Sequence, residues 1–236
     1  MSARYYDTAR REVLPWLPER VARMLDVGCG AGATTAIVQE ARAVEWAGGI
    51  EYVEEVAVEA EARLDCVWQG DAALAPLEAE IAPASLDLVL CLDVLEHMSD
   101  PWTMVRRLSA LVAPGGRLIL SVPNVRHWKF LWRLFARGDF AYRDAGLLDR
   151  THLRFFVRKT AVELATCGGL SLVAAVSAQR WRFPEPRWWL HRASAGRLDE
   201  IVAKQWLVVA EKHAGLPESP EPDQGSGIED TSGRIR

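Results

Sequence analysis

The sequence predicts an α/β fold with a doubly wound, mostly parallel seven-stranded sheet. Short apolar runs alternate with helix-length segments along the first 125 residues, which is the pattern of parallel strands joined by crossover helices. A glycine-rich turn, Gly28-Cys-Gly-Ala-Gly32, follows the first of these runs. The chain has 236 residues, 50% of them hydrophobic, so it is long enough to bury one sizeable core.

Each strand has its own signal. The first covers residues 21–27 and ends just before the glycines, and residues 86–92 form a near-continuous apolar run, as expected for a strand covered on both faces. The remaining predicted strands cover residues 46–51, 66–69, 117–122, 170–176 and 205–210.

Helical spacing of apolar residues predicts the helices between these strands. Ile37, Ala41 and Val44 indicate a helix directly after the glycine turn. Pro101 begins another, with Trp102, Val105, Leu108 and Val112 on one face. Pro114-Gly-Gly predicts a turn before the fifth strand. Two further helices are predicted over residues 53–62 and 159–168.

Two segments interrupt this alternation. Residues 126–157 are far longer than the roughly 2 to 6 residues of an ordinary βα connection, so we expect a lid or binding segment there. Residues 179–200 form a second insertion, rich in tryptophan and arginine. The domain is therefore predicted to cover residues 1–213, with both insertions capping one side. Residues 214–236, rich in Pro, Ser, Gly and acids, are predicted to be a disordered acidic tail.

Charge is distributed unevenly along the chain. Residues 1–125 contain 10 Lys+Arg and 19 Asp+Glu, whereas residues 126–197 contain 14 and 5. The first part should favour a cationic ligand and the second an anionic one. No apolar run reaches the roughly 18 to 20 residues of a membrane span. The four cysteines lack metal-type spacing, so we expect reduced thiols in a cytoplasmic protein.

Three carboxylates end three successive predicted strands. Asp26 lies just before the glycines, where it would repel a pyrophosphate but attract an ammonium group. Glu51 follows Gly32 by 19 residues, the place from which a carboxylate accepts both hydroxyls of a ribose. Asp71 ends the third strand, within reach of an adenine amino group. All three lie on the rim where open α/β sheets bind ligands.

With these residues in place, the chain resembles the class I S-adenosylmethionine-dependent methyltransferases, whose fold is Rossmann-like. The resemblance is strongest over residues 20–125. It rests on Leu25-Asp-Val-Gly-Cys-Gly-Ala-Gly32, Gly49-Ile-Glu51, Gly70-Asp71, Leu92-Asp-Val-Leu-Glu-His97 and Ala113-Pro-Gly-Gly116. It implies S-adenosyl-L-methionine as cofactor and a cofactor site made of Asp26, Gly28, Cys29, Gly30, Gly32, Glu51, Tyr52, Asp71, Ala72, Asp93 and Leu95.

Two other classes compete with this interpretation. An NAD(P)-dependent oxidoreductase would also use a glycine turn, and Ala33 occupies the last position of its fingerprint. Asp26, Asp71 and the absence of a predicted helix between the last two strands favour the methyltransferase instead. A non-enzymatic binding module would not need the intact glycines and all three cofactor carboxylates.

The methyl acceptor is predicted from the histidines and the first insertion. An alcohol acceptor must lose a proton, and His97, His127 and His152 are the candidate general bases. The stretch from Ser121 to Phe156 resembles methyltransferases associated with sugar and surface-polysaccharide biosynthesis. This implies O-methylation of an anionic, phosphate-bearing or lipid-linked sugar. The residues expected to bind it are Arg126, Trp128, Tyr142, Arg143, Arg150 and Arg154.

A second chemistry stays open at the same place. Asp93-x-x-Glu96-His97 is similar to the E-x-x-E-H metal motif of ubiquinone-pathway O-methyltransferases and of small-RNA 2′-O-methyltransferases, which makes these residues weak candidates for a divalent metal. This alternative implies a phenolic or quinone precursor or an RNA 2′-hydroxyl as acceptor. The acidic chain, with no dedicated binding module, disfavours nucleic acid. For residues 179–200, two roles fit: contact with a membrane surface, or a homodimer interface.

Overall fold

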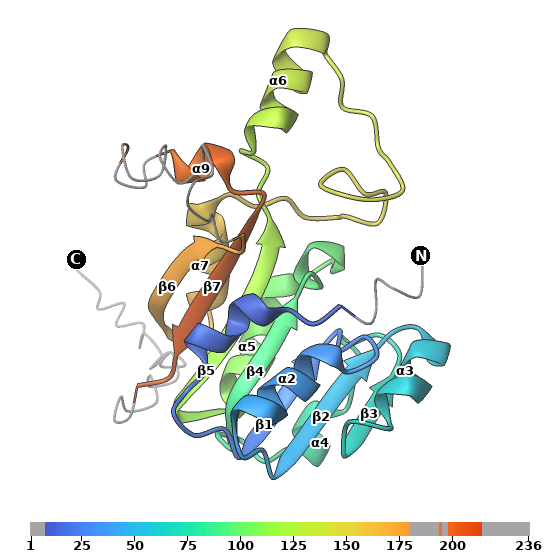
Figure 1. Ribbon diagram of the computed structural model, residues 1–236, viewed down its shortest axis with the longest axis vertical. Coiled ribbons are helices and arrows are strands. Elements are labelled where there is room, and N and C mark those ends of the chain that lie inside the picture. The colour runs from blue at the N-terminus through green and yellow to red at the C-terminus, as the bar shows by residue number, and fades with distance from the viewer. Residues whose placement is uncertain (1–7, 180–193, 195–197, 214–236) are drawn as a thin grey trace, which may run out of the picture.

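The computed structural model describes residues 8–179, 194 and 198–213. Seven strands form one sheet in the order β3-β2-β1-β4-β5-β7-β6 (Figure 1). β7 runs antiparallel to both of its neighbours, and the other pairs are parallel. The strands are β1 Arg23–Val27, β2 Trp46–Glu51, β3 Cys66–Gln69, β4 Leu86–Leu92, β5 Val112–Pro123, β6 Ser171–Ser177 and β7 Gln205–Glu211. The predicted doubly wound, mostly parallel sheet is confirmed.

Helices cover both faces of this sheet. The short helix η1 packs with α2 and α3 against one face, and α4, α5 and α7 pack against the other. Their bounds are η1 Arg11–Trp16, α2 Ala33–Ala41, α3 Glu54–Ala60, α4 Leu77–Glu80, α5 Pro101–Leu111 and α7 Arg158–Thr166. Three further helices lie at or beyond the carboxyl ends of the strands: η2 Leu95–His97, α6 Trp128–Arg137 and α9 Asp199–Val202.

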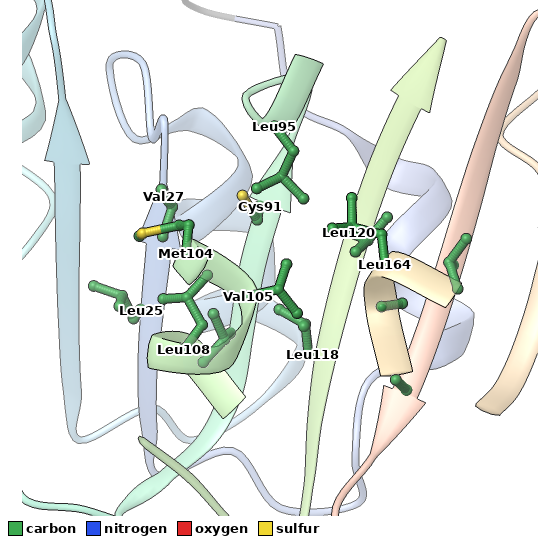
Figure 2. Packing of buried hydrophobic residues seen from close by; sticks show 14 of the residues in the cluster. Leu25, Val27, Cys91, Leu95, Met104, Val105, Leu108, Leu118, Leu120 and Leu164 are labelled. Carbon is green, nitrogen blue, oxygen red and sulfur yellow. The ribbon is translucent and has the colours of Figure 1, made fainter. Parts of the chain in front are cut away.

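The central strand β4 shows how the core forms. Its side chains alternate between the two faces, so Val89 and Cys91 pack toward α5 while Leu88 and Leu90 pack toward η1 and α2. Figure 2 shows the α5 side, where Leu108 meets the strands. Burial of each such leucine contributes about 1.5 to 3 kcal/mol. The two apolar layers hold the carboxyl ends of β1, β2 and β4 side by side.

Helix α5 confirms one sequence signal and corrects another. Its N-cap is Asp100, whose side chain accepts a hydrogen bond of 3.0 Å from the Thr103 amide, and Pro101 follows as the first helical residue. Val105 and Leu108 are buried as expected. Trp102 is 39% exposed, because the buried face is centred on Leu108 and Trp102 lies to the side of it.

Two further differences concern β5 and the segment after it. The predicted turn at residues 114–116 is an irregularity inside β5, where Leu86 pairs with Val112 but Leu88 pairs with Arg117. The segment predicted as a lid begins with α6, which stands away from the sheet beyond its carboxyl end (Figure 1). Most of the second insertion and the predicted tail lie outside the described residues. Among the described residues, no helix is long and apolar enough to span a membrane.

Candidate active site

The glycine turn between β1 and α2 leaves no room for a side chain at Gly28. Gly28 has a φ of +73°, and a Cβ built on it would lie 2.3 Å from Cγ2 of Val94. The amides of Gly28 and Cys29 donate to the carbonyl of Ile50, at 2.8 and 3.1 Å. The turn is therefore held against β2, and its backbone can approach a ligand closely.

Asp26 is a buried acid at the end of β1. Its carboxylate accepts a hydrogen bond of 2.9 Å from the hydroxyl of Thr35 in α2. Burial raises the pKa of Asp26 to about 7, and the nearby negative charge of Glu51 acts in the same direction. A cationic group brought to this place would favour the ionised carboxylate, so the site suits an ammonium group.

Glu51 is buried at the end of β2 and joins the turn to that strand. One of its oxygens accepts from the amide of Gly30 at 3.0 Å, and the other accepts from Val53 at 2.9 Å. A carboxylate has about four lone-pair sites, so both oxygens can still accept hydroxyl groups. The next residue, Tyr52, is exposed.

Asp71 completes the row at the end of β3. Its carboxylate is exposed and accepts a hydrogen bond of 2.9 Å from the amide of Ala73, while Ala72 is buried beside it. Asp26, Glu51 and Asp71 thus end β1, β2 and β3, which are adjacent strands. The structure brings together the carboxylates that the sequence predicted.

The two residues predicted beyond β4 have different surroundings. Asp93 has a φ of +59°, which is uncommon for a residue other than glycine, and its carboxylate faces the N-terminal segment. Leu95 is fully buried in the core below this loop (Figure 2), so only its backbone is available to a ligand.

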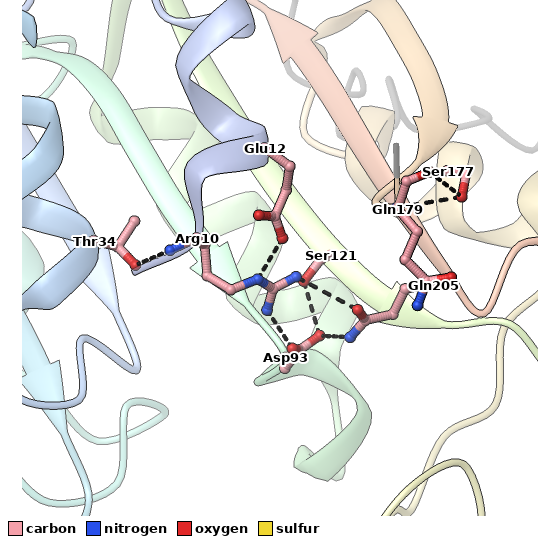
Figure 3. A network of polar contacts seen from close by, with 8 residues as sticks. All are labelled: Arg10, Glu12, Thr34, Asp93, Ser121, Ser177, Gln179 and Gln205. Atoms are coloured by element: carbon pink, nitrogen blue, oxygen red, sulfur yellow. Dashed lines mark hydrogen bonds and ion pairs between the residues drawn. The ribbon is translucent and has the colours of Figure 1, made fainter. Parts of the chain in front are cut away.

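A polar network around Asp93 was not predicted from the sequence. Arg10 forms an ion pair with Asp93, Gln205 of β7 donates to the same carboxylate, and Ser121 of β5 donates to it at 2.8 Å (Figure 3). Arg10 also pairs with Glu12. Arg10 and Asp93 are 83 residues apart, so no local pattern could join them.

On the acceptor side, η2 and the end of the first insertion bring two histidines together. The rings of His97 and His152 meet edge to face, with centroids 4.7 Å apart. With Glu96 they offer one ligand atom each, all within 4.8 Å of one another, which makes them a group that could hold a metal ion. The weak metal candidate Asp93 is not a member of this group, and His152 takes its place.

Hydrogen bonds orient both rings. The hydroxyl of Thr151 donates to Asp149 at 2.7 Å, so its oxygen accepts from Nδ1 of His97 at 2.9 Å. Nδ1 of His152 lies 3.0 Å from the carbonyl oxygen of Leu147, which can only accept. Each ring therefore carries its proton on Nδ1, and Nε2 keeps a free lone pair. Burial and the neighbouring His152 lower the pKa of His97, which favours the neutral ring.

Glu96 is the buried acid of this group. Burial, and then the charge of Asp93, raise its pKa well above the ordinary value. Within the described residues its Oε2 has no hydrogen-bond partner. The carbonyl of Glu96 accepts from the amides of Leu153 and Arg154, at 2.8 and 3.0 Å, and these bonds dock the end of the insertion beside η2.

The third predicted base, His127, lies elsewhere. It is buried at the N-cap of α6, 6.1 Å from the Trp128 ring, and does not belong to the group of Glu96 and the other two histidines.

The predicted substrate residues of the insertion are dispersed. Trp128 and Tyr142 are exposed. Arg126, Arg143 and Arg150 pair with acidic residues, namely Glu200, Asp139 and Asp144. Arg154 donates to the carbonyl of Ser99.

The comparisons with known proteins point to a single family. A family profile described as a methyltransferase domain matches residues 2–205. A ubiquinone biosynthesis O-methyltransferase of Pseudomonas aeruginosa is 38% identical over 176 residues, which is 66% of this chain and 72% of that enzyme. The enzyme of the same name in Xanthomonas campestris is 29% identical over 163 residues, and the match spans 66% of its length and 63% of this chain.

Solved structures share the fold at low identity. A methyltransferase solved with the Trm112 activator of Haloferax volcanii has a TM-score of 0.61 at 17% identity, over 89% of this chain and 91% of that one. A methyltransferase of Archaeoglobus fulgidus has a TM-score of 0.60 at 16% identity, over 89% and 95%.

The fold and the row of strand-end carboxylates define a class I S-adenosylmethionine-dependent methyltransferase. The chain belongs to the methyltransferase domain family. The predicted class of enzyme and its cofactor, S-adenosylmethionine, are confirmed.

Proposed function

We propose that this methyltransferase methylates a hydroxyl group of a small aromatic molecule, a phenolic or quinone-type precursor. The observation that carries the proposal is the group of Glu96, His97 and His152, in which a carboxyl oxygen and one nitrogen of each imidazole ring lie within 4.8 Å of one another beyond β4. The names of the curated relatives, ubiquinone biosynthesis O-methyltransferases, support the same class of acceptor.

Residues at the strand ends would hold the cofactor. Asp26 would face the ammonium group of its methionine end, and Glu51 the ribose hydroxyls. The guanidinium of Arg10, which pairs with Asp93, would face the carboxylate of that end. When bound, S-adenosylmethionine supplies a methyl group attached to a cationic sulfur. An acceptor oxygen aligned with this carbon–sulfur bond would take the methyl group and displace the sulfur.

His97 would take the proton of the acceptor hydroxyl on Nε2. Its Nδ1 proton is held by Thr151, and Asp149 in turn holds Thr151, so the ring is fixed in the tautomer that a base needs. Because the pKa of His97 is lowered, the ring is neutral near pH 7 and ready to accept a proton. His152, at the end of the first insertion, lies beside the ring of His97.

The same group fits a divalent cation. Two imidazole nitrogens with free lone pairs and a carboxyl oxygen without a partner are a donor set for first-row transition metals. Glu96, His97 and His152 would hold such an ion, whose charge would lower the pKa of the acceptor hydroxyl. The base and the metal are therefore two versions of one proposal, and the sensitivity of the activity to a chelator separates them.

A sugar acceptor is the second candidate, and it stays a prediction. The resemblance of residues 121–156 to sugar methyltransferases supports it. The arginines expected to bind phosphate support it less, because Arg126, Arg143 and Arg150 already pair with acids.

Three acceptors offered side by side test the proposal. The protein is incubated with S-adenosylmethionine and 3,4-dihydroxybenzoate, a nucleoside-diphosphate sugar or a short RNA, and methylated product is identified by mass spectrometry. We expect methylation of the dihydroxybenzoate, with the sugar nucleotide and the RNA unchanged. Methylation of the sugar nucleotide with no aromatic product would overturn the phenolic assignment in favour of the glycan.

A further inference from the structure

The loop between β3 and α4 carries Asp71, which we expect to face the amino group of the cofactor's adenine. Residues 70–76 read Gly-Asp-Ala-Ala-Leu-Ala-Pro, so most of their side chains are small. The strand that leads into the loop, β3, is at the edge of the sheet and pairs with β2, and α4 has four residues. Small side chains make few packing contacts, so the position of this loop depends strongly on its hydrogen bonds.

Arg107 of α5 supplies hydrogen bonds to this loop from a distant part of the chain. Its guanidinium donates to the carbonyl oxygens of Ala73 and Ala75, both at 2.7 Å. It also forms a bidentate ion pair with Glu78 of α4, in which Nε donates to one carboxylate oxygen and Nη2 to the other. A guanidinium has five N–H donors, and these four bonds direct most of them to one short segment.

The core holds Arg107 in place. Its neighbours on α5, Val105 and Leu108, are buried against the central strands. On the other side of the ion pair, the hydrogen bond from Arg107 lowers the pKa of Glu78 to about 2, so the carboxylate stays ionised at neutral pH. Because the planar guanidinium is anchored at both ends, it fixes the position of the loop carbonyls that it contacts.

The loop in turn orients Asp71. The amide of Ala73, whose carbonyl Arg107 holds, donates to the carboxylate of Asp71 at 2.9 Å. Asp26 and Glu51 are buried at the ends of their strands, whereas Asp71 is exposed. Of the three strand-end carboxylates, Asp71 is therefore the one whose direction depends on a loop and on the side chain that holds that loop.

We propose that Arg107 is a positioning residue for the adenine end of the cofactor. By holding the carbonyls of Ala73 and Ala75, it keeps the loop in the shape that directs Asp71 toward the amino group of adenine. Arg107 acts through Asp71 and takes no part in methyl transfer, so its effect appears in how strongly the site prefers adenine to another base. The inference rests on the placing of adenine at Asp71 and not on the choice of methyl acceptor.

Calorimetric titration with two ligands tests the inference. One is S-adenosylhomocysteine, and the other is its 6-desamino analogue, which has purine in place of adenine. We expect the wild type to bind S-adenosylhomocysteine about tenfold more tightly, because the analogue lacks the amino group that donates to the carboxylate. Arg107→Ala should reduce this preference to about threefold or less. Arg107→Lys keeps the charge but not the fork of donors, so its preference should lie between the two.

Arg106→Ala is the matched control. Arg106 is the neighbouring arginine of α5, is exposed, and donates to Thr103 of its own helix, so its removal should leave the preference unchanged. Glu78→Gln is a milder variant should Arg107→Ala fail to fold, and it should lower the preference by about twofold. If Arg107→Ala weakens both ligands equally and keeps the preference, Arg107 only stabilises the fold and the positioning role is wrong. Equal losses of preference in Arg106→Ala and Arg107→Ala would also overturn it.

Asp71→Ala separates the placing of adenine from the role of Arg107. In the wild-type background it should remove the preference, and in the Arg107→Ala background it should change little, because both substitutions act on one interaction. If Asp71→Ala leaves the preference unchanged, adenine does not lie at Asp71 and the inference falls with that placing. If Asp71→Ala removes it and Arg107→Ala does not, adenine is placed correctly and Arg107 has no positioning role. Methylation of 3,4-dihydroxybenzoate tests the acceptor separately.

Discussion

The cofactor side and the acceptor side of this methyltransferase are built in different ways. Around the glycine turn of the cofactor side, contacts join residues that are close along the chain: Thr35 bonds to Asp26 nine residues away, and Gly30 to Glu51 over 21 residues. On the acceptor side, Thr151 reaches His97 across 54 residues. The glycine turn depends on one βαβ unit, whereas the acceptor side depends on how an insertion returns to the sheet.

The buried acids of the two sides also differ in their hydrogen bonds. Asp26 and Glu96 are both buried, and burial raises the pKa of each. Asp26 has a hydroxyl donor in Thr35, whereas Oε2 of Glu96 has no partner within the described residues. A buried carboxyl oxygen without a hydrogen-bond partner costs free energy. It therefore indicates a partner that binds during the reaction, such as an acceptor hydroxyl or a cation. A buried oxygen of the acceptor side therefore still needs a hydrogen-bond partner, whereas the buried Asp26 of the cofactor side already has one.

The largest expected effect comes from His97→Ala, which removes the proton acceptor. Turnover of 3,4-dihydroxybenzoate should fall about 10²- to 10⁴-fold, while calorimetry should find the affinity for S-adenosylhomocysteine unchanged. Because the pKa of His97 is lowered from 6.5, kcat of the wild type should level off by neutral pH and fall only in more acidic solution. The matched control is His127→Ala, which changes a histidine outside the group.

A chelator distinguishes the base from the metal in the same assay. The base is supported if the wild type stays active in EDTA and turnover falls mainly in His97→Ala. Activity abolished by EDTA and restored by Mn²⁺, with equal losses in Glu96→Gln and His152→Ala, supports the metal. If His97→Ala and His127→Ala lose turnover equally, or neither does, the assignment of the acceptor side is wrong.

Next in size is Glu51→Ala on the cofactor side. The substitution removes the carboxylate that we expect to accept the ribose hydroxyls, so S-adenosylhomocysteine should bind about 1 to 3 kcal/mol more weakly. Calorimetric titration measures this. Glu54→Ala, an exposed acid in the first turn of α3, is the control and should bind normally. Unchanged affinity in Glu51→Ala would contradict the ribose assignment.

The smallest effect is expected from Asp26→Asn, which should stabilise the folded chain. The folded pKa of Asp26 is about 7 and the ordinary value is 3.8, so the folded chain keeps a proton that the unfolded chain loses. Its contribution to stability therefore declines as pH rises from 3.8 to 7. A neutral asparagine avoids this decline and should raise the free energy of unfolding by about 1 to 2 kcal/mol above neutral pH.

Denaturant unfolding at mildly acidic and mildly alkaline pH checks the stability of Asp26→Asn. The gain should vanish on the acidic side, where aspartic acid is already neutral. Cofactor affinity should fall at alkaline pH, because the ammonium group loses its carboxylate. Glu59→Gln, on the exposed side of α3, serves as the control. Equal stability of the wild type and Asp26→Asn at both pH values would show that Asp26 is ionised in the free protein.

The sequence by itself determined the sheet, the cofactor and the three strand-end carboxylates. A strand that ends in an acid beside a glycine turn is a local pattern, and parallel strands necessarily bring such ends to one edge. Local patterning failed at residues 114–116, where a bulge replaces the expected turn, and at α6, whose helical spacing was hidden among arginines and aromatics.

Only the tertiary structure decided the rest. It joined Arg10 to Asp93 and His97 to Thr151 and His152, and it separated His127 from them. It also showed that Trp128 is exposed on α6, where its ring lies near that of His127. The physical reason is that side-chain contacts between distant segments depend on how long insertions pack, and residue type and spacing carry no record of that packing.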